Sequence, residues 1–481
     1  MEKIKFVIFG GTGDLTKRKL LPALYNLETE NLLPKDFEVI AVGRRNLNSD
    51  LYKEKAIIAI QEYSRKELDL DIWEKFQKKI NYLKMNFLKE DDYHHLGKLL
   101  QDSKQVIFYF AVAPEYFETI TVNLEKKVLK ELKISPQVVI EKPFGYDLTS
   151  AIFLNNLLVK TFGERNIYRI DHYLGKEMLQ NIMFIRFANS IFEPIWNHHY
   201  IEQIQIISSE TLGIENRGNY YEQAGALRDM LQSHLLQLLS LIAMEKPDNL
   251  DTETIRNEKV KVLENLKPLS DDEIRDYLVC GQYGGSDEIP AYREEANVGI
   301  DSNTETFVAL RTFIDNERWQ NVPFYILTGK RLPVKKTEII IQFKKLSSPY
   351  HEEEIKNNLL VFKIQPEEGI YFEFNSKKPG TPREIVPVKM DFCQNCEIGI
   401  NSPEAYERLL FDVIRGDATL FTRWDEVEHS WRFVDRIIAS RSKKKDFPNY
   451  LAFSWGPVEA KEMIEKDKKN WLTLEEKYEN L

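Results

Sequence analysis

From Lys3 to about Asp171, short apolar runs alternate with helix-length stretches. The apolar runs, which predict strands, are Lys5 to Phe9, Phe37 to Val42, Ile80 to Met85, Gln105 to Val112 and Val138 to Glu141. The stretches between them include Leu15 to Glu30, Asp50 to Ser64 and Pro114 to Lys130. Nearly all-apolar strands separated by helices are typical of a parallel sheet that is covered on both faces. The pattern therefore predicts an α/β, Rossmann-like domain over residues 1–175, of the type that binds dinucleotides.

After about residue 180, apolar and polar positions alternate with a period of two. The segments with this pattern are Tyr200 to Ser208, Glu338 to Phe343, Leu359 to Ile364, Ile370 to Phe374 and Val386 to Phe392. Most of them follow one another through short turns, which predicts a mainly antiparallel sheet exposed on one side. Two long helical stretches accompany them, Tyr221 to Met244 and Ser402 to Arg415. We therefore expect a larger α+β domain over residues 176–481.

Length, charge and hydropathy narrow the classes of protein that fit. A chain of 481 residues is too long for one compact core, so two or three domains are expected. The net charge of -10 argues against nucleic-acid binding, because an acidic protein repels a polyphosphate. No run of about 18 apolar residues occurs, so no membrane-spanning segment is expected.

The cysteines point to neither a disulfide framework nor a metal site. Three cysteines are too few for such a framework in a chain of this size, which fits a reducing, cytoplasmic compartment. Cys393 and Cys396 form a CxxC pair, but no second pair and no nearby histidine cluster completes a zinc site. We therefore expect no metal.

A glycine-rich turn follows the first predicted strand. It consists of Gly10, Gly11, Thr12, Gly13, Asp14 and Leu15, and a helix is predicted to follow. Glycines are needed where the backbone turns tightly and approaches a pyrophosphate at a helix N-terminus. The position between a strand and a helix favours dinucleotide binding, with a purely structural turn as the alternative.

Two further predicted strands end in cations. Arg44 and Arg45 follow the second strand, where an NAD enzyme usually has an acidic side chain for the ribose 2'-hydroxyl, so they favour a 2'-phosphate and hence NADP. Thr12 is a further donor for that phosphate, although one or both arginines facing solvent is the simpler alternative. Lys142 follows the strand that ends near Ile140, at the sheet edge where ligands bind. A cis peptide at Pro143 is plausible there, and a simple strand-ending turn is the alternative.

The segment IYRIDHYLGKE, from Ile167 to Glu177, concentrates reactive side chains after a short apolar strand. An acid, an imidazole, a phenol and an ammonium group occur within six residues, at Asp171, His172, Tyr173 and Lys176. Such groups can orient a catalytic base and hold an anion side by side. The alternative is a solvated loop of mixed polarity.

His234 lies beside a helical apolar stripe. The stripe consists of Leu231, Leu235, Leu238, Leu239 and Ile242. A histidine at such a position is by default a hydrogen-bonded core residue. Asp229 stands five positions earlier, about 140° around an α-helix, so the two side chains are not expected to stack.

Taken together, these motifs closely resemble the glucose-6-phosphate dehydrogenase family. The resemblance spans nearly the whole chain, with several long motifs in the right order. They are FGGTGDLTKRKL, EKPFG, RIDHYLGKE, RFANSIFEPIWN from Arg186 to Asn197, ALRDMLQSHLLQ from Ala226 to Gln237, TGKRLPVKKTEIIIQF from Thr328 to Phe343, IQPEEGI from Ile364 to Ile370 and PEAYERLLFDVIRGD from Pro403 to Asp417.

The resemblance implies oxidation of glucose 6-phosphate to 6-phosphogluconolactone with reduction of NADP, at the entry to the oxidative pentose phosphate route. It implies that His234 is the general base and Asp171 its partner, and that His172, Tyr173 and Lys176 contact the substrate phosphate. The residues that match contacts to the sugar or phosphate are Lys142, Glu210, Asp229, Lys330, Lys335 and Gln365. Gly10, Thr12, Gly13 and Arg44 match the cofactor turn and the 2'-phosphate site. A homodimer or a dimer of dimers is implied as well.

The implied chemistry agrees with the residue types. Loss of hydride from a carbon that bears a hydroxyl must be accompanied by loss of the hydroxyl proton, which a neutral histidine accepts near pH 7. A carboxylate orients such a histidine and stabilises the imidazolium. No metal is required. Two alternatives remain, a sugar-phosphate or glucose dehydrogenase of altered specificity and a non-catalytic NADP-binding regulator.

Overall fold

The computed structural model describes residues 3–286, 288–345, 355–393, 403–441 and 446–472. The chain forms two units. Unit 1 comprises Met1–Lys176, Asp251–Arg256 and Pro403–Glu428, and unit 2 comprises Glu177–Leu250, Asn257–Ser402 and His429–Leu481. Two short segments from the second half of the chain therefore belong to the unit that holds the N-terminus.

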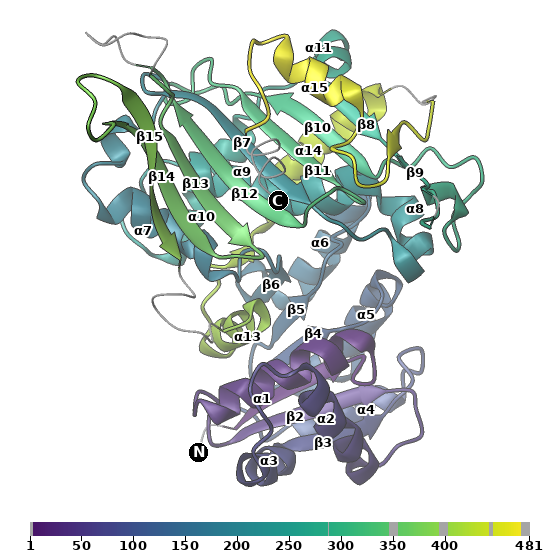
Figure 1. The fold of residues 1–481 in the computed structure, drawn as a ribbon. Helices are drawn as coiled ribbons and strands as arrows, with labels where there is room; N and C mark the ends of the chain where they lie inside the picture. The colour runs from purple at the N-terminus through teal and green to yellow at the C-terminus, as the bar shows by residue number, and fades with distance from the viewer. Residues whose placement is uncertain (1–2, 287, 346–354, 394–402, 442–445, 473–481) are drawn as a thin grey trace. The chain divides into compact units, whose positions relative to one another are not determined.

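Unit 1 is built on a seven-stranded sheet in the order β3-β2-β1-β4-β5-β6-β16 (Figure 1). Its strands are β1 (Ile4–Phe9), β2 (Phe37–Gly43), β3 (Ile80–Lys84), β4 (Gln105–Phe110), β5 (Gln137–Ile140), β6 (Ile167–Ile170) and β16 (Phe421–Thr422). All neighbouring pairs are parallel except β16 with β6. The predicted Rossmann-like parallel sheet is confirmed, and the order 3-2-1-4-5-6 is that of dinucleotide-binding folds.

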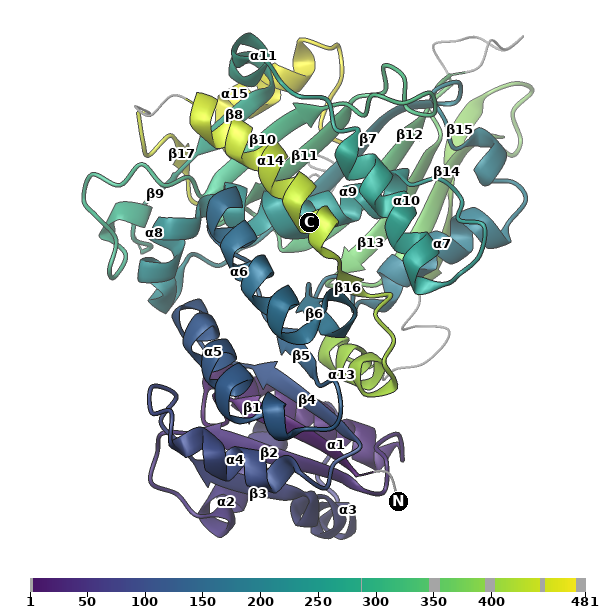
Figure 2. The ribbon, with the colours of Figure 1, turned by 180° about the vertical axis from the view of Figure 1, so that it is seen from behind.

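Helices cover both faces of this sheet. The helices are α1 (Leu21–Thr29), α2 (Ser49–Tyr63), α3 (Leu70–Phe76), α4 (Asp92–Leu100), α5 (Phe117–Lys127), α6 (Leu148–Phe162) and α13 (Ala405–Arg415). Helix α1 packs with α2, α3 and α13 on one face, whereas α4, α5 and α6 pack together on the other (Figure 2). All six residues of β1 are buried, as expected for a strand between two helical layers.

Buried polar contacts attach the late segments to unit 1. The carboxylate of Glu407 in α13 is 1% exposed and accepts hydrogen bonds from Arg65 Nε at 2.7 Å and Asn26 Nδ2 at 3.0 Å. Arg256 donates from Nε and Nη2 to the carbonyl oxygen of Phe421 at 3.1 and 2.7 Å. These side chains lie far apart in sequence, so only the folded chain brings them together.

Unit 2 contains an eight-stranded sheet in the order β15-β14-β13-β12-β7-β11-β10-β8. Its strands are β7 (Ile201–Ser209), β8 (Leu278–Gly281), β10 (Phe307–Thr312), β11 (Phe324–Gly329), β12 (Lys336–Phe343), β13 (Leu359–Gln365), β14 (Gly369–Lys377) and β15 (Ile385–Cys393). Only the pairing of β7 with β11 is parallel within this sheet. The expectation of a mainly antiparallel second sheet is confirmed.

The expected exposure of one face of this sheet is wrong for its central strands. Every residue of β11 is buried, and so is all of β10 except Arg311. One face packs against helix α15 (Val458–Glu465) and Trp471. The opposite face carries α7 (Glu177–Ala188) and α9 (Leu236–Ala243) (Figure 2). Strands β8, β10 and β11 lack a clean period-two pattern, which is why the sequence pattern did not predict them.

The long helical stretch around His234 is not one regular α-helix. Helix α8 (Gly218–Ala226) contains a break at Gly225, whose φ is +60°. A π-helical segment, Leu227–Leu235, follows and leads into α9. Because its hydrogen bonds run from i to i+5, each turn contains more residues than an α-helical turn, so residues five apart lie closer to the same side. The α-helical spacing assumed for Asp229 and His234 is therefore wrong, and both side chains lie on one side of the segment.

Three further α-helices lie among the described residues of the second half. They are α10 (Thr252–Glu264), α11 (Asp271–Tyr277) and α14 (Trp424–Ser440). Strands β9 (Tyr283–Gly284) and β17 (Tyr450–Leu451) form a small parallel pair. Among the described residues, no helix has both the length and the apolar character that crossing a bilayer requires. Cys393 is disulfide-bonded and Cys280 is a buried free thiol, whereas Cys396 lies outside the described residues.

Candidate active site

The carboxyl ends of the parallel strands in unit 1 gather its predicted site residues along one edge. The register pairs Phe9 with Val42 and Phe110, Phe110 with Ile140, and Ile140 with Arg169. The segments that leave these strands at the same edge are Gly10–Leu15 after β1, Arg44 after β2, Lys142 after β5 and Asp171–Lys176 after β6. Strands β2 and β3 follow β1 on one side of the sheet, whereas β4, β5 and β6 lie on the other side. Open α/β sheets bind ligands at such a switch point in strand order.

The turn after β1 requires its glycines. Gly10 has a φ of +92°, and a Cβ atom there would lie 2.1 Å from the Ala111 carbonyl oxygen. A Cβ at Gly11 would lie 2.7 Å from the Cβ of Ala41. The Gly13 N–H donates to the Gly10 carbonyl at 2.8 Å, which closes the turn. The backbone therefore approaches the sheet more closely than any side chain would permit, as a phosphate-cradling turn needs.

Thr12 lies beside the end of β2. A Cβ added to Gly43 would be 3.4 Å from Thr12 Oγ1, so the hydroxyl borders the position from which Arg44 projects. Arg44 and Arg45 are exposed. A hydroxyl and two exposed guanidinium groups at the end of the second strand match the requirements of a ribose 2'-phosphate.

The segment after β6 is ordered around a buried carboxylate. Asp171 is 3% exposed, and its Oδ1 accepts the backbone N–H of Tyr173 at 3.0 Å. His172 is exposed, and its ring centroid lies 5.0 Å from that of the buried Tyr173. Lys176 Nζ lies 4.6 Å from the Tyr173 ring centroid. One imidazole and one ammonium group thus flank the same phenol ring, which suits the binding of an anion.

Glu141 is a titratable group that the sequence interpretation did not single out, although it belongs to the EKPFG motif. Its Oε1 accepts hydrogen bonds from the hydroxyls of Tyr109 and Tyr406, the latter at 3.0 Å. Burial of the carboxyl raises the pKa of Glu141 from 4.5 to about 7, although both tyrosines act in the opposite direction. Glu141 precedes Lys142, so a protonation change here occurs directly beside a predicted ligand contact.

Unit 2 gathers its own predicted site residues at one sheet edge. Parallel pairing of Ser209 with Gly329 places the next residues, Glu210 and Lys330, side by side. Lys336 pairs with Ser209 and Thr337 with Gln365, so the same edge includes Lys335 before β12 and Gln365 at the end of β13. The Gln365 side chain donates to Thr337 Oγ1 at 2.9 Å. Lys335 is exposed.

The ammonium group of Lys330 is the buried cation of this edge. It is ion-paired with Glu210 and lies 5.1 Å from the ring centroid of Tyr221. Burial raises the pKa of Tyr221 well above its usual value, so this phenol stays neutral. Tyr221 and its neighbour Tyr220 were not predicted, because tyrosines at the start of a helix carry no distinctive pattern.

The π-helical segment carries Asp229 and His234. Asp229 is 9% exposed and His234 is 3% exposed. Tyr220 donates its hydroxyl proton to Asp229 Oδ1 at 2.9 Å. π-Helical turns inside α-helices are frequent at functional sites. Asp171 and His234 belong to different units, so unit 1 holds the predicted carboxylate and unit 2 the predicted base.

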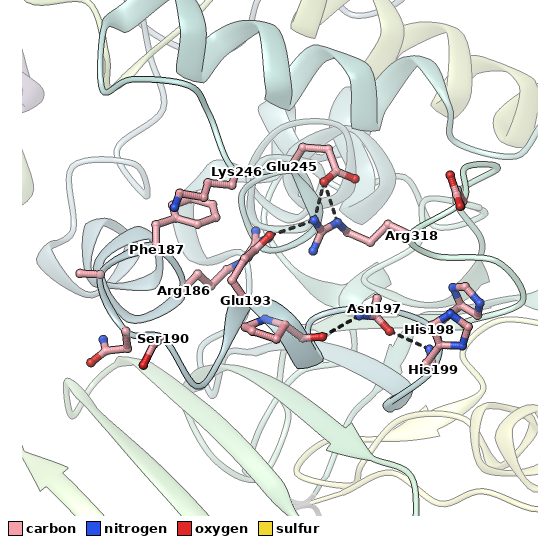
Figure 3. Close-up of a pocket in the computed structure, with 14 residues that line it drawn as sticks. Arg186, Phe187, Ser190, Glu193, Asn197, His198, His199, Glu245, Lys246 and Arg318 are labelled. Carbon is pink, nitrogen blue, oxygen red and sulfur yellow. Dashed lines mark hydrogen bonds and ion pairs between the residues drawn. The ribbon is translucent and has the colours of Figure 1, made fainter.

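A pocket of about 860 Å³ in unit 2 contains none of the predicted site residues (Figure 3). Three of the charged groups at its wall are paired with one another, since Arg318 Nη2 lies 2.8 Å from Glu193 Oε1 and Arg186 Nη2 lies 3.2 Å from Glu193 Oε2. Arg318 also contacts Glu245, as Figure 3 shows. Burial lowers the pKa of Arg186 to about 10. The motif RFANSIFEPIWN therefore contributes ion pairs around the buried side chain of Arg186.

Comparison with known proteins matches both halves of the chain. The family model "Glucose-6-phosphate dehydrogenase, NAD binding domain" matches residues 7–181, and "Glucose-6-phosphate dehydrogenase, C-terminal domain" matches residues 183–472. The chain is 46% identical to a glucose-6-phosphate 1-dehydrogenase of Bacillus subtilis (strain 168), over 98% of this chain and 99% of that protein. It is 44% identical to that of Chlamydia pneumoniae, over 97% and 96%.

Solved structures agree with these matches. One, described as glucose-6-phosphate dehydrogenase in complex with its substrate glucose-6-phosphate, superposes with a TM-score of 0.90 at 33% identity and covers 98% of both chains. Another, a glucose-6-phosphate 1-dehydrogenase from Mycobacterium avium, gives a TM-score of 0.86 at 31% identity, with 98% of both chains covered.

Glu141 predicts a specific dependence of stability on pH. The folded chain retains the Glu141 proton up to about pH 7, whereas an unfolded chain releases it near pH 4.5. The contribution of this carboxyl to the free energy of unfolding is therefore fully present below pH 4.5. It is lost as the pH rises to 7. Glu141→Gln should remove this slope, which amounts to at most about 3 kcal/mol. Thermal denaturation between about pH 5 and about pH 8 measures it.

Glu74→Gln, which changes an exposed carboxyl of the same unit, is the matched control and should keep the wild-type slope. Parallel plots of Tm against pH for wild type and Glu141→Gln would contradict the assignment.

Proposed function

The chain belongs to the glucose-6-phosphate dehydrogenase family and is therefore an oxidoreductase with a dinucleotide-binding domain, and we propose that it oxidises D-glucose 6-phosphate to 6-phospho-D-glucono-1,5-lactone with hydride transfer to NADP. This reaction is the first step of the oxidative pentose phosphate pathway. The observation that carries the proposal is the gathering of the predicted residues at two sheet edges in a chain that matches the family along nearly its whole length. Each edge combines cations with a carboxylate, which suits a ligand that carries both a phosphate and hydroxyl groups.

We assign proton removal to His234. When the anomeric carbon loses hydride, its hydroxyl must lose a proton, and a neutral imidazole accepts that proton near pH 7. Asp171 is proposed as the partner that orients the ring and stabilises the imidazolium. Both side chains are buried, which supports this assignment because a carboxylate stabilises an imidazolium more strongly away from water.

Substrate binding divides between the two sets of residues. His172, Tyr173 and Lys176 are proposed to hold the phosphate, since the imidazole and the ammonium group flank one phenol ring. Glu210, Asp229, Lys330, Lys335 and Gln365 are proposed to hold the sugar hydroxyls and the phosphate. Acceptors and donors alternate in this set, which suits a polyhydroxylated ligand. Holding the sugar in one orientation makes hydride transfer an effectively unimolecular step between reactants that are already oriented.

The residues at the edge of unit 1 fit NADP. The backbone at Gly10 and Gly11 packs so closely against Ala111 and Ala41 that no Cβ atom fits, and Thr12 and Arg44 border the end of β2. Asp14 and Leu15 begin the helix whose N-terminus faces the turn, where backbone N–H groups favour a pyrophosphate. Lys142 is proposed to contact both cofactor and substrate. When bound, NADP supplies the hydride acceptor.

A spectrophotometric assay with a panel of substrates tests the proposal. Glucose 6-phosphate with NADP should give the highest kcat/KM, well above free glucose and galactose 6-phosphate, with NAD compared in parallel. Equal efficiency on free glucose would contradict the phosphate-binding roles of His172 and Lys176 and favour a glucose dehydrogenase. Cofactor binding without any reduction would favour a non-catalytic NADP-binding protein.

His234→Asn should lower kcat by about two to four orders of magnitude, the usual effect of losing a general base. The KM for glucose 6-phosphate should change little, because the phosphate contacts remain. Steady-state kinetics on the purified variant measure both constants. His199→Asn, which alters an exposed histidine of the same unit, is the control and should retain wild-type turnover. Near-normal turnover of His234→Asn would exclude His234 as the base.

Arg44→Ala should raise the KM for NADP by about 10- to 100-fold and leave that for NAD nearly unchanged. A charge-assisted hydrogen bond to the 2'-phosphate contributes about 1.5–3 kcal/mol, and NAD lacks that phosphate. Lys55→Ala removes another exposed cation from unit 1 and controls for the general loss of positive charge. An equal loss of affinity for both cofactors would mean that Arg44 does not read the 2'-phosphate.

A further inference from the structure

We propose that Glu305 and Arg441 are a positioning pair that holds the beginning of the π-helical segment Leu227–Leu235 and so directs the side chains of Asp229 and His234. The inference rests on the proposed function, because it acts through His234 as the base. Neither residue belongs to the predicted site. All the groups concerned lie within unit 2.

Glu305 binds the backbone where the segment begins. Its carbonyl oxygen accepts the Ala226 N–H at 2.9 Å, and its carboxylate Oε1 accepts the Leu227 N–H at 3.1 Å. The Glu305 side chain is 1% exposed. The first N–H groups of a helix have no partner within the helix, and a carboxylate there also favours the helix dipole. One residue thus supplies acceptors to two successive N–H groups.

The backbone is shaped to admit this carboxylate. Gly225 has a φ of +60°, and a Cβ atom at this position would lie 2.4 Å from Glu305 Oε1. Any other side chain at residue 225 would displace the carboxylate from the Leu227 N–H. The break in α8 at Gly225 therefore lies where Glu305 approaches.

Arg441 holds the other oxygen of the same carboxylate. Its Nη1 is ion-paired with Glu305 Oε2, and the arginine side chain is 22% exposed. A buried carboxylate without a cation is costly, so Arg441 makes the burial of Glu305 tolerable. The two carboxylate oxygens therefore have different partners. Oε1 accepts the Leu227 N–H and Oε2 is paired with the guanidinium of Arg441.

The next residue, Thr306, links Glu305 to Lys330. The Thr306 carbonyl accepts the Lys330 N–H at 3.0 Å, and the Tyr450 hydroxyl donates to the Lys330 carbonyl at 2.8 Å. Tyr450 and Thr306 share a further hydrogen bond of 2.9 Å. Glu305 and Thr306 thus connect the π-helical segment to the buried cation of the sheet edge. Displacing Glu305 should move the proposed base relative to the proposed substrate contacts.

Glu305→Gln and Arg441→Met test the pair, with Arg441→Lys as the conservative variant. We expect kcat/KM for glucose 6-phosphate to fall about 10- to 100-fold in the first two, the scale of an error of about 1 Å in position. The KM for NADP should stay within about twofold, because the proposed cofactor contacts belong to unit 1. Arg441→Lys should recover part of the loss.

The pH dependence of kcat/KM separates positioning from mere stability. A loss of folded enzyme lowers kcat/KM by the same factor at every pH. Displacement of the His234 imidazole instead places it in different surroundings, which changes its pKa. We expect the acidic limb to move by about half a pH unit or more in Glu305→Gln and Arg441→Met. Arg311→Met is the matched control. Arg311 is also 22% exposed and paired with an acid, Asp467, at 2.8 Å, and its loss should leave the limb in place.

Profiles of Glu305→Gln and Arg441→Met that superimpose on wild type after scaling would overturn the inference and leave the proposed function intact. Near-normal turnover of His234→Asn, measured alongside, would overturn the role of the base and this inference with it. If Glu305→Gln does not fold by circular dichroism, the two Arg441 variants decide the question.

Discussion

Parallel pairing of β1 with β2 and β4 is the constraint on which unit 1 depends. Because parallel strands end at one edge, the residues that follow β1, β2, β5 and β6 lie along that edge, although Gly10 and His172, for example, are 162 positions apart in the chain. The strands are buried on both faces, so a shift of register would expose apolar side chains or clash with the helices. The buried pairing of these strands thus determines the fold of unit 1. It also determines the distance between the glycine turn and the carboxylate of Asp171.

In unit 2 a single parallel contact has the corresponding effect. Strands β7 and β11 are parallel neighbours within an otherwise antiparallel sheet, which brings the residues after them, Glu210 and Lys330, together as an ion pair. An antiparallel arrangement would have placed these residues at opposite edges. Helical layers on both faces bury the central strands, and the π-helical segment then presents Asp229 and His234 from one of these layers.

Buried charge has two distinct roles in this chain. The carboxylate of Glu407 and the guanidinium of Arg186 are enclosed by partners, and breaking such a pair usually costs about 3–5 kcal/mol. Glu141 has hydroxyl donors, and burial holds its pKa at about 7. Groups with such perturbed pKa values cluster at functional sites, but charges that support the fold can be perturbed as well, since burial lowers the pKa of Arg186 to about 10. Position at a sheet edge distinguishes the two roles here.

The sequence alone determined the elements whose signal is local. Apolar runs indicated the parallel strands, Gly10 to Gly13 indicated the turn, and Arg44, Lys142 and Asp171 were found because each directly follows a strand. Strands β10 and β11 and the π-helical register were not predicted, because apolar and polar residues do not alternate in these two strands and an i to i+5 hydrogen bond leaves no residue pattern. Only the tertiary structure decided that Tyr406 would bind Glu141 and that Arg441 would bind Glu305. These partners are 265 and 136 positions apart, and their pairing arises from burial in a shared interior, which no local stretch of sequence records.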